Sequence, residues 1–106
     1  DGAAAMVADA LALQQAGADL MLVECIPSAL GKQLRDALAV PLIGIGAGPD
    51  TDAQVLVLHD MLGISQRLPS FSRNFLDHHG SILEALRGYG EAVRSGQFPS
   101  AAESFA

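Results

Sequence analysis

The spacing of hydrophobic residues along the chain predicts three helices. Residues 3–16 are good helix formers with a broad apolar face, and Gly17 stands where helices commonly end. Residues 28–38 carry apolar side chains at helical spacing, behind Pro27, which a first helical turn tolerates. Residues 81–95 predict a last helix, and its apolar face consists of Ile82, Leu86, Tyr89 and Val93.

Short apolar runs between these helices predict strands. Residues 20–23 and 41–46 lack polar alternation, which is typical of strands covered on both faces in a parallel sheet. The run at residues 54–58 is too short to distinguish strand from helix, although Val55 and Val57 favour a strand. The remaining segments are expected to be irregular at 64–72, a helix or turn at 72–78, and a tail at 96–106.

The predicted order is helix, strand, helix, strand, strand, helix, which indicates an α/β fold with parallel strands and crossover helices. In such sheets, functional groups gather at the carboxyl ends of the strands. Three polar or flexible sites fall at those ends, namely Glu24, residues 46–48, and His59 with Asp60. Three strands cannot close a barrel, so the sheet is expected to keep an open apolar edge. We therefore predict a functional site at one edge of the sheet.

Glu24 is the strongest candidate for chemistry because it directly follows four apolar residues. A partly desolvated carboxylate there would suit a general base, and a salt bridge or helix cap is the alternative. Gly46 and Gly48 could let backbone N–H groups approach a ligand, whereas a tight turn with close helix packing is the structural alternative. The glycine spacing differs from the dinucleotide-binding fingerprint.

The other polar residues are expected to have structural roles. In an extended strand His59 and Asp60 point to opposite faces, which favours a hydrogen-bonded histidine and an aspartate that caps the next turn. Cys25 has no basic neighbour in the sequence and is expected to be a small buried thiol. Further local roles are expected for Ser28 at a helix start, Asp50 and Asp52 as caps, and His78 and His79 on the solvated surface.

Composition narrows the classes of function. The net charge is −6 with only six Lys and Arg residues, which disfavours binding to nucleic acids or to anionic membranes. Cys25 is the only cysteine, so neither an intrachain disulfide nor a Cys-based zinc site can form. No segment reads as a signal peptide or a membrane span, and we expect a cytoplasmic protein. The chain begins without Met inside a helical pattern, which suggests a missing upstream part.

Three ordered blocks of the sequence resemble ketopantoate hydroxymethyltransferases. They are residues 23–27 (VECIP), 41–48 (PLIGIGAG) and 51–63 (TDAQVLVLHDMLG). The segment that follows the last barrel strand in that family is matched by Pro69, Phe71, Asn74 and Phe75. The C-terminal end of the family is matched by Tyr89, Gly96 and Pro99. The resemblance therefore covers nearly the whole chain.

This resemblance implies that the chain is the C-terminal part of a (β/α)₈ TIM barrel whose N-terminal part is missing. Residues 1–71 would supply distal strands and helices, and residues 72–106 the C-terminal helices and tail. The implied reaction transfers a hydroxymethyl group from 5,10-methylenetetrahydrofolate to 3-methyl-2-oxobutanoate, giving ketopantoate for pantothenate and coenzyme A. Glu24 matches the family's proton acceptor, and Gly46 and Gly48 are candidate substrate contacts.

The resemblance also implies Mg²⁺ and a homo-oligomer. Mg²⁺ would polarise the carbonyl of the 2-oxo acid, and its ligands would lie outside this chain, so the isolated chain is expected to be inactive. Two alternatives are a related Mg²⁺-dependent barrel of the phosphoenolpyruvate mutase and isocitrate lyase group, and a non-catalytic fragment that associates with itself. Departures from the family's usual pattern occur at Gly31, Ala53, residues 65–68, Ser70 and Ser72.

Overall fold

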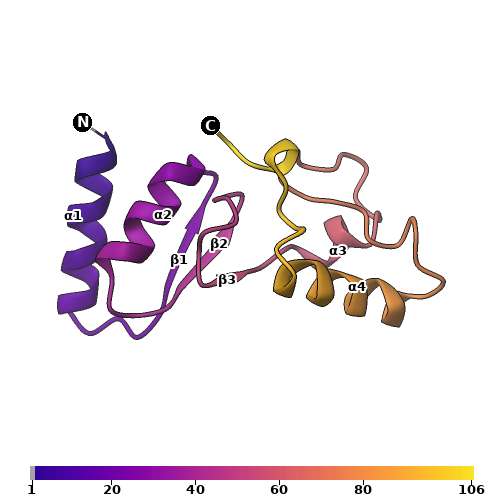
Figure 1. Cartoon of the computed structure of the whole chain (residues 1–106), viewed down its shortest axis with the longest axis horizontal. Helices are drawn as coiled ribbons and strands as arrows, with labels where there is room; N and C mark the ends of the chain where they lie inside the picture. Colours follow the sequence, from indigo (N-terminus) through magenta and orange to yellow (C-terminus); the bar gives the residue numbers. More distant parts are fainter. Residues whose placement is uncertain (1) are drawn as a thin grey trace.

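The computed structural model describes residues 2–106 and contains a small parallel sheet (Figure 1). The elements, in chain order, are α1 (Gly2–Gln15), β1 (Met21–Glu24), α2 (Ser28–Ala37), β2 (Leu42–Ile45), β3 (Ala53–Gln54), α3 (Leu58–Met61), α4 (Ile82–Arg94) and the 3₁₀ helix η1 (Ala101–Glu103). The three predicted helices and the first two predicted strands are confirmed to within one residue at each end. Among the described residues, no helix combines the length and the apolar character needed to cross a membrane.

The strands lie in the order β1-β2-β3 and are all parallel, which confirms the predicted α/β arrangement. The chain passes from β1 to β2 through α2, and the register places Met21 beside Leu42 and Glu24 beside Ile45. β3 adds only a short pairing on the other side of β2. The two longer strands therefore end side by side at one edge of the sheet.

Helices α1 and α2 pack on one face of this sheet and enclose the first hydrophobic cluster (Figure 1). Leu34 of α2 and Leu42 of β2 are fully buried there, and burying a leucine contributes about 1.5–3 kcal/mol. Gln14 of α1 fixes the segment before β2, because its Oε1 accepts from the N–H groups of Ala39 (2.7 Å) and Val40 (3.2 Å). The buried members of the cluster are Ala10, Met21, Ile26, Leu30, Leu34, Leu42 and Ala47.

The opposite face of the sheet is largely uncovered in the part of the chain that the structure describes. Val23 packs against the first cluster, and side chains alternate along a strand, so Leu22 and Glu24 lie on the other face. Leu22 is 55% exposed, and Ile43 and Ile45 beside these two residues are half-buried. An exposed apolar face of this kind is typical of a surface that packs against another part of a protein.

A second hydrophobic cluster lies between α3, α4 and the loops around them. The rings of Phe75, Tyr89 and Phe98 meet edge to face, with centroids 5.3 to 5.8 Å apart. The buried members are Met61, Leu62, Phe75, Ala85, Ala92 and Phe98. All members of this second cluster come from residues 56–98, and the predicted division between residues 71 and 72 stays a prediction.

The predicted strand at residues 54–58 is wrong beyond Gln54. β3 ends there, and α3 begins at Leu58, so His59 and Asp60 lie in a short helix. This helix turns Met61 into the second cluster, where the side chain is only 3% exposed. Burial of Met61 against residues distant in sequence explains why the local β preference did not decide the structure.

The predicted apolar face of α4 is also partly wrong. Ile82 is 57% exposed and Leu86 is 40% exposed, whereas Ala85 and Ala92 are buried. Small alanine side chains let the helix backbone approach the aromatic rings of the second cluster closely. Tyr89 and Val93, the other two members of the predicted face, pack against the same cluster.

The predicted tail at residues 96–106 is wrong, because this segment is ordered against both parts of the chain. Phe98 is 3% exposed in the second cluster, and η1 follows it. Phe105 then forms a parallel bridge with Pro27, just before α2. The irregular segment at residues 64–72 and the turn within residues 72–78 are confirmed.

Candidate functional site

Glu24 lies at the carboxyl end of the sheet, as predicted. It is the last residue of β1, and its Cα partner in β2 is Ile45, at a strand spacing of about 4.8 Å. Its side chain lies on the face opposite α1 and α2. Among residues 2–106 its carboxylate has no hydrogen bond or ion pair, so the salt-bridge and helix-cap alternatives are not observed. The carboxylate is therefore available as a proton acceptor.

The expectation that Glu24 is partly desolvated is wrong for this chain, since the residue is exposed. The apolar residues before it do not bury it, because the face of the sheet that carries it has little cover. Desolvation of this carboxylate would require further protein to pack against the face that carries Leu22 and Glu24.

Cys25 is exposed rather than buried, which corrects the prediction from sequence. Its φ of 55° places the backbone in the left-handed region, where a residue with a Cβ is uncommon. Its N–H donates to the carbonyl of Ile45 (2.9 Å), and the N–H of Ile26 donates to the carbonyl of Gly46 (3.1 Å). These two bonds join the turn after β1 to the end of β2, directly beside Glu24.

The glycine turn after β2 is close to Glu24, but its two candidate residues have packing roles. Gly46 and Gly48 are buried, with φ of 64° and 82°. A Cβ on Gly48 would overlap the side chain of Ser28 and lie 2.9 Å from its Cα. A Cβ on Gly46 would lie 3.0 Å from the ring of Phe71. The geometry thus supports the tight-turn alternative, and a substrate contact of these glycines stays a prediction.

His59 and Asp60 are not brought to the strand ends, so the predicted convergence of three sites holds for two of them. Ser65 donates from Oγ to Oδ1 of Asp60 at 2.6 Å, so this aspartate has a structural role through a side-chain bond and does not cap the turn as predicted. The N–H of Ile64 donates to the main-chain carbonyl of His59 (2.9 Å), whereas the His59 side chain is exposed. Both residues therefore order the loop after α3.

The remaining polar candidates have local contacts. Asp52 caps the start of β2, because its Oδ2 accepts from the N–H of Leu42 at 2.8 Å. Ser28 begins α2 as predicted, although its Oγ donates to the carbonyl of Phe105 (3.3 Å) and not to its own helix. His79 is half-buried, which corrects its assignment to the surface, and its Nδ1 bonds the carbonyl of Phe75.

Sequence reasoning missed the aromatic residues that lie on the glycine turn. The rings of Phe71 and Phe105 come within 3.0 and 3.3 Å of the Cβ position of Gly46. One signal of order at the chain end was available, because Ser100 and Glu103 have the spacing of a capping box, which the structure contains. The contact between Phe105 and a turn near residue 46 had no local signal.

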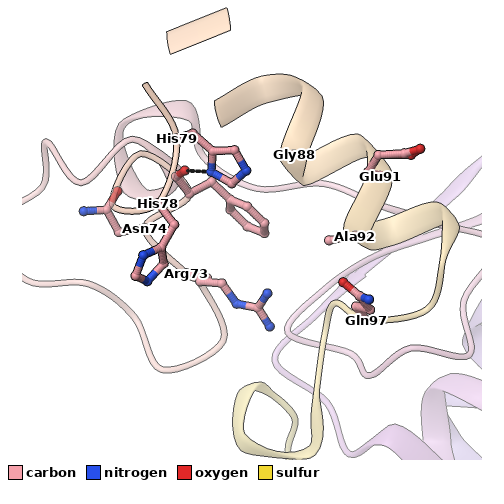
Figure 2. Close-up of a pocket in the computed structure, with 9 residues that line it drawn as sticks. Arg73, Asn74, His78, His79, Gly88, Glu91, Ala92 and Gln97 are labelled. Carbon is pink, nitrogen blue, oxygen red and sulfur yellow. Dashed lines mark hydrogen bonds between the residues drawn. The ribbon is translucent and has the colours of Figure 1, made fainter. Parts of the chain in front are cut away.

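A pocket of about 340 Å³ lies in the second cluster, on a different part of the chain from Glu24 (Figure 2). Figure 2 shows Arg73, His78 and His79 on one side and Gln97 with α4 on the other. His79 lies against Gly88, where any larger side chain would overlap its ring. The guanidinium of Arg73 is already paired with Glu103, so its charge serves the fold.

The described residues do not provide a metal centre. Within residues 2–106, no three His, Cys, Asp or Glu side chains gather closely enough to hold a metal ion. We therefore assign none of the described residues as a metal ligand.

Comparison with known proteins identifies the family. The model of the ketopantoate hydroxymethyltransferase family matches residues 1–101. A 3-methyl-2-oxobutanoate hydroxymethyltransferase of Alkalilimnicola ehrlichii is 58% identical over 95% of this chain and 37% of its own length. The protein of that name from Idiomarina loihiensis is 56% identical over 91% of this chain and 36% of its own length. The one from Shewanella loihica is 50% identical over 99% of this chain and 40% of its own length.

The chain thus spans less than half the length of these curated relatives, and it is similar to them over nearly all of its own length. The family match and the three relatives agree with the resemblance found in the sequence blocks around Glu24 and the glycine turn. On this evidence, the chain belongs to the ketopantoate hydroxymethyltransferase family.

Proposed function

We propose that the protein carrying this chain transfers a hydroxymethyl group from 5,10-methylenetetrahydrofolate to 3-methyl-2-oxobutanoate, and that Glu24 is its proton acceptor. The names of the relatives support the acceptor substrate and the type of reaction. The observation that carries the role of Glu24 is its position: an unpaired carboxylate at the carboxyl end of a parallel strand, beside a glycine turn.

The proposed role follows from the chemistry of the acceptor. Its C3 atom lies next to a ketone, so loss of the C3 proton gives an enolate. An ionised carboxylate is acceptor-only and can take that proton if it lies within hydrogen-bonding reach. Water first releases the methylene carbon from the folate at the oxidation level of formaldehyde: both C–N bonds break, and the two hydrogens of water end on the nitrogens of the departing tetrahydrofolate. The enolate carbon then forms the C–C bond to this carbon, and the resulting alkoxide takes back the proton held by Glu24.

We further propose that the sheet is part of a (β/α)₈ barrel. Two observations support this: the strands are parallel, and α1 and α2 cover only one of the two faces. In such a barrel helices form the outer ring and the other strand face points inward. Leu22 and Ile43 would then fill the interior, and Glu24 would lie at its rim with much less exposure to water.

The resemblance extends the proposal to Mg²⁺, a homo-oligomeric assembly and a cytoplasmic location. The resemblance places the ligands of Mg²⁺ outside this chain, and the steps assigned to Glu24 do not depend on the geometry of the metal. The matched family is not the phosphoenolpyruvate mutase and isocitrate lyase group, so that alternative is not favoured.

The experiment that tests this proposal is an assay of ketopantoate formation by the whole protein. Both substrates are supplied together, and reactions that lack one of them serve as controls. Formation of ketopantoate only with both substrates is the expected result. Absence of ketopantoate in the complete reaction would reject the proposed function.

A further inference from the structure

The end of the chain returns to the edge of the sheet that carries Glu24. Figure 1 shows the yellow C-terminal segment running back from α4 toward the start of α2. Phe105 forms a parallel bridge with Pro27, and its carbonyl accepts from the N–H of Ser28 (3.0 Å). Residues 98–106 therefore connect the second cluster to the carboxyl end of β1.

This return places two aromatic rings on the glycine turn that follows the strand partner of Glu24. Phe71 and Phe105 both lie on Gly46, which directly follows Ile45, the strand partner of Glu24. On the β1 side, the bridge partner of Phe105 is Pro27, three residues after Glu24. Phe105 thus contacts both segments that lead away from the carboxylate, and it remains 36% exposed.

An ion pair holds this segment in place. Arg73 donates from Nε and Nη2 to the two carboxylate oxygens of Glu103, at 2.6 and 2.7 Å. Ser100 adds its N–H and Oγ to the same carboxylate, both at 2.9 Å. Ser104 closes the turn by donating to the carbonyl of Ser100 (2.7 Å). Bidentate pairs of this kind fix orientation as well as position.

We propose that Phe71 and Phe105 form the apolar wall of the substrate site beside Glu24, and that the Arg73–Glu103 pair holds this wall in place. The inference rests on the proposed function. In 3-methyl-2-oxobutanoate the C3 atom bears both the proton to be removed and two methyl groups. A base that reaches this proton therefore brings the methyl groups close to its own surroundings, and an apolar wall there favours a branched 2-oxo acid.

The test compares two 2-oxo acids in the whole protein. Phe105→Ala removes the ring but keeps the carbonyl that binds Ser28, and the readout is the ratio of kcat/KM for 3-methyl-2-oxobutanoate to that for 2-oxobutanoate. We expect this ratio to fall about tenfold, the size of effect typical of one methyl group in an apolar pocket. Phe105→Leu should retain most of the ratio, and Leu83→Ala, at an exposed position of α4, should leave it unchanged.

Glu103→Gln provides the second arm, because it weakens the ion pair and leaves both rings intact. We expect the ratio to fall in this variant too, as the segment is released from the sheet. Exchange of the Ser28 amide hydrogen reports whether the segment is bound, since this N–H donates to Phe105. If Phe105→Ala lowers the kcat/KM ratio while the Ser28 amide stays protected, the loss is due to the missing ring and not to release of the segment. This result supports the apolar wall directly.

The outcomes separate this inference from the proposed function. An active protein whose ratio is unchanged in Phe105→Ala overturns the wall and leaves the reaction standing. An unchanged ratio in Glu103→Gln, with the Ser28 amide exposed, overturns the role of the ion pair. A wild-type protein that makes no product from either 2-oxo acid rejects the proposed function, and this inference with it.

Discussion

Substitution of Glu103 by Gln is the change whose effect the structure defines most closely. The carboxylate accepts two hydrogen bonds from Arg73 and two from Ser100, and its side chain is only 12% exposed. Partial burial of Glu103 acts to raise its pKa, but the bonds from Arg73 and Ser100 outweigh this, so the pKa lies below its ordinary value. Gln keeps the shape of the side chain and removes its charge.

The expected magnitude follows from these contacts. A hydrogen bond to a charged group contributes about 1.5–3 kcal/mol. Because the Arg73 side chain is 38% exposed, solvent screening reduces this value, and we expect Glu103→Gln to cost about 1–2 kcal/mol in binding of the C-terminal segment. That change corresponds to about a 5- to 30-fold shift in the equilibrium between bound and released segment.

Amide hydrogen exchange at Ser28 measures this equilibrium in the chain. We expect faster exchange of the Ser28 amide in Glu103→Gln by the same factor, with core amides unchanged. Glu91→Gln is the matched control, because Glu91 is 73% exposed and its nearest Arg94 nitrogen is 3.6 Å away. An equal effect of both variants, or no effect of Glu103→Gln, would refute the reasoning.

The pH dependence of Ser28 amide protection in the wild-type chain reports the same contribution of Glu103. Since the pKa of Glu103 is lowered in the folded chain, its contribution is fully present above the ordinary carboxyl value of 4.5. The contribution is lost as the pH falls through the lowered pKa. Protection of Ser28 should therefore weaken in acid, and Glu103→Gln should abolish this part of the pH dependence.

Further predictions concern stability and activity. In urea titrations of the 106-residue chain, Leu42→Ala should lower the free energy of unfolding by about 2–5 kcal/mol, and Leu22→Ala, at a position exposed in this chain, by less than about 0.5 kcal/mol. Gly48→Ala should cost more than about 1–2 kcal/mol because its left-handed φ is combined with overlap on Ser28. Gly80→Ala meets open space and should have little effect in the same titration. The 106-residue chain assayed alone should produce no ketopantoate; detectable turnover would contradict its assignment as an incomplete site.

Local sequence patterns were sufficient to predict the helices and strands whose buried residues can be recognised from their own segment. The helix ending before Gly17 follows from helical periodicity, and the two longer strands follow from short apolar runs without alternation. The parallel arrangement then places Glu24 beside the glycine turn. The segment around His59 was misassigned because Met61 packs in a cluster with residues more than ten positions away. No local sequence pattern encodes such a contact. The family resemblance located Glu24 but gave no indication of the contacts made by Phe105.

Two errors about burial have a common physical cause. The sequence places Glu24 and Cys25 after an apolar run, and apolar runs indicate strands covered on both faces. The described residues cover only one face, so both residues are exposed. The apolar pattern of β1 therefore indicates a strand that is covered on both faces in a larger protein. The exposure of Glu24 and Cys25 is that of the 106-residue chain alone.

The central claim is that Glu24 removes a proton from the 2-oxo acid at the carboxyl end of β1. Its most direct test is the turnover of Glu24→Gln in the whole protein, measured with both substrates and with Glu91→Gln as the control. We predict that turnover falls by about 10²- to 10⁴-fold in Glu24→Gln, the range typical of a lost general base, while Mg²⁺ binding is unchanged. Turnover equal to that of the wild-type protein would contradict the account.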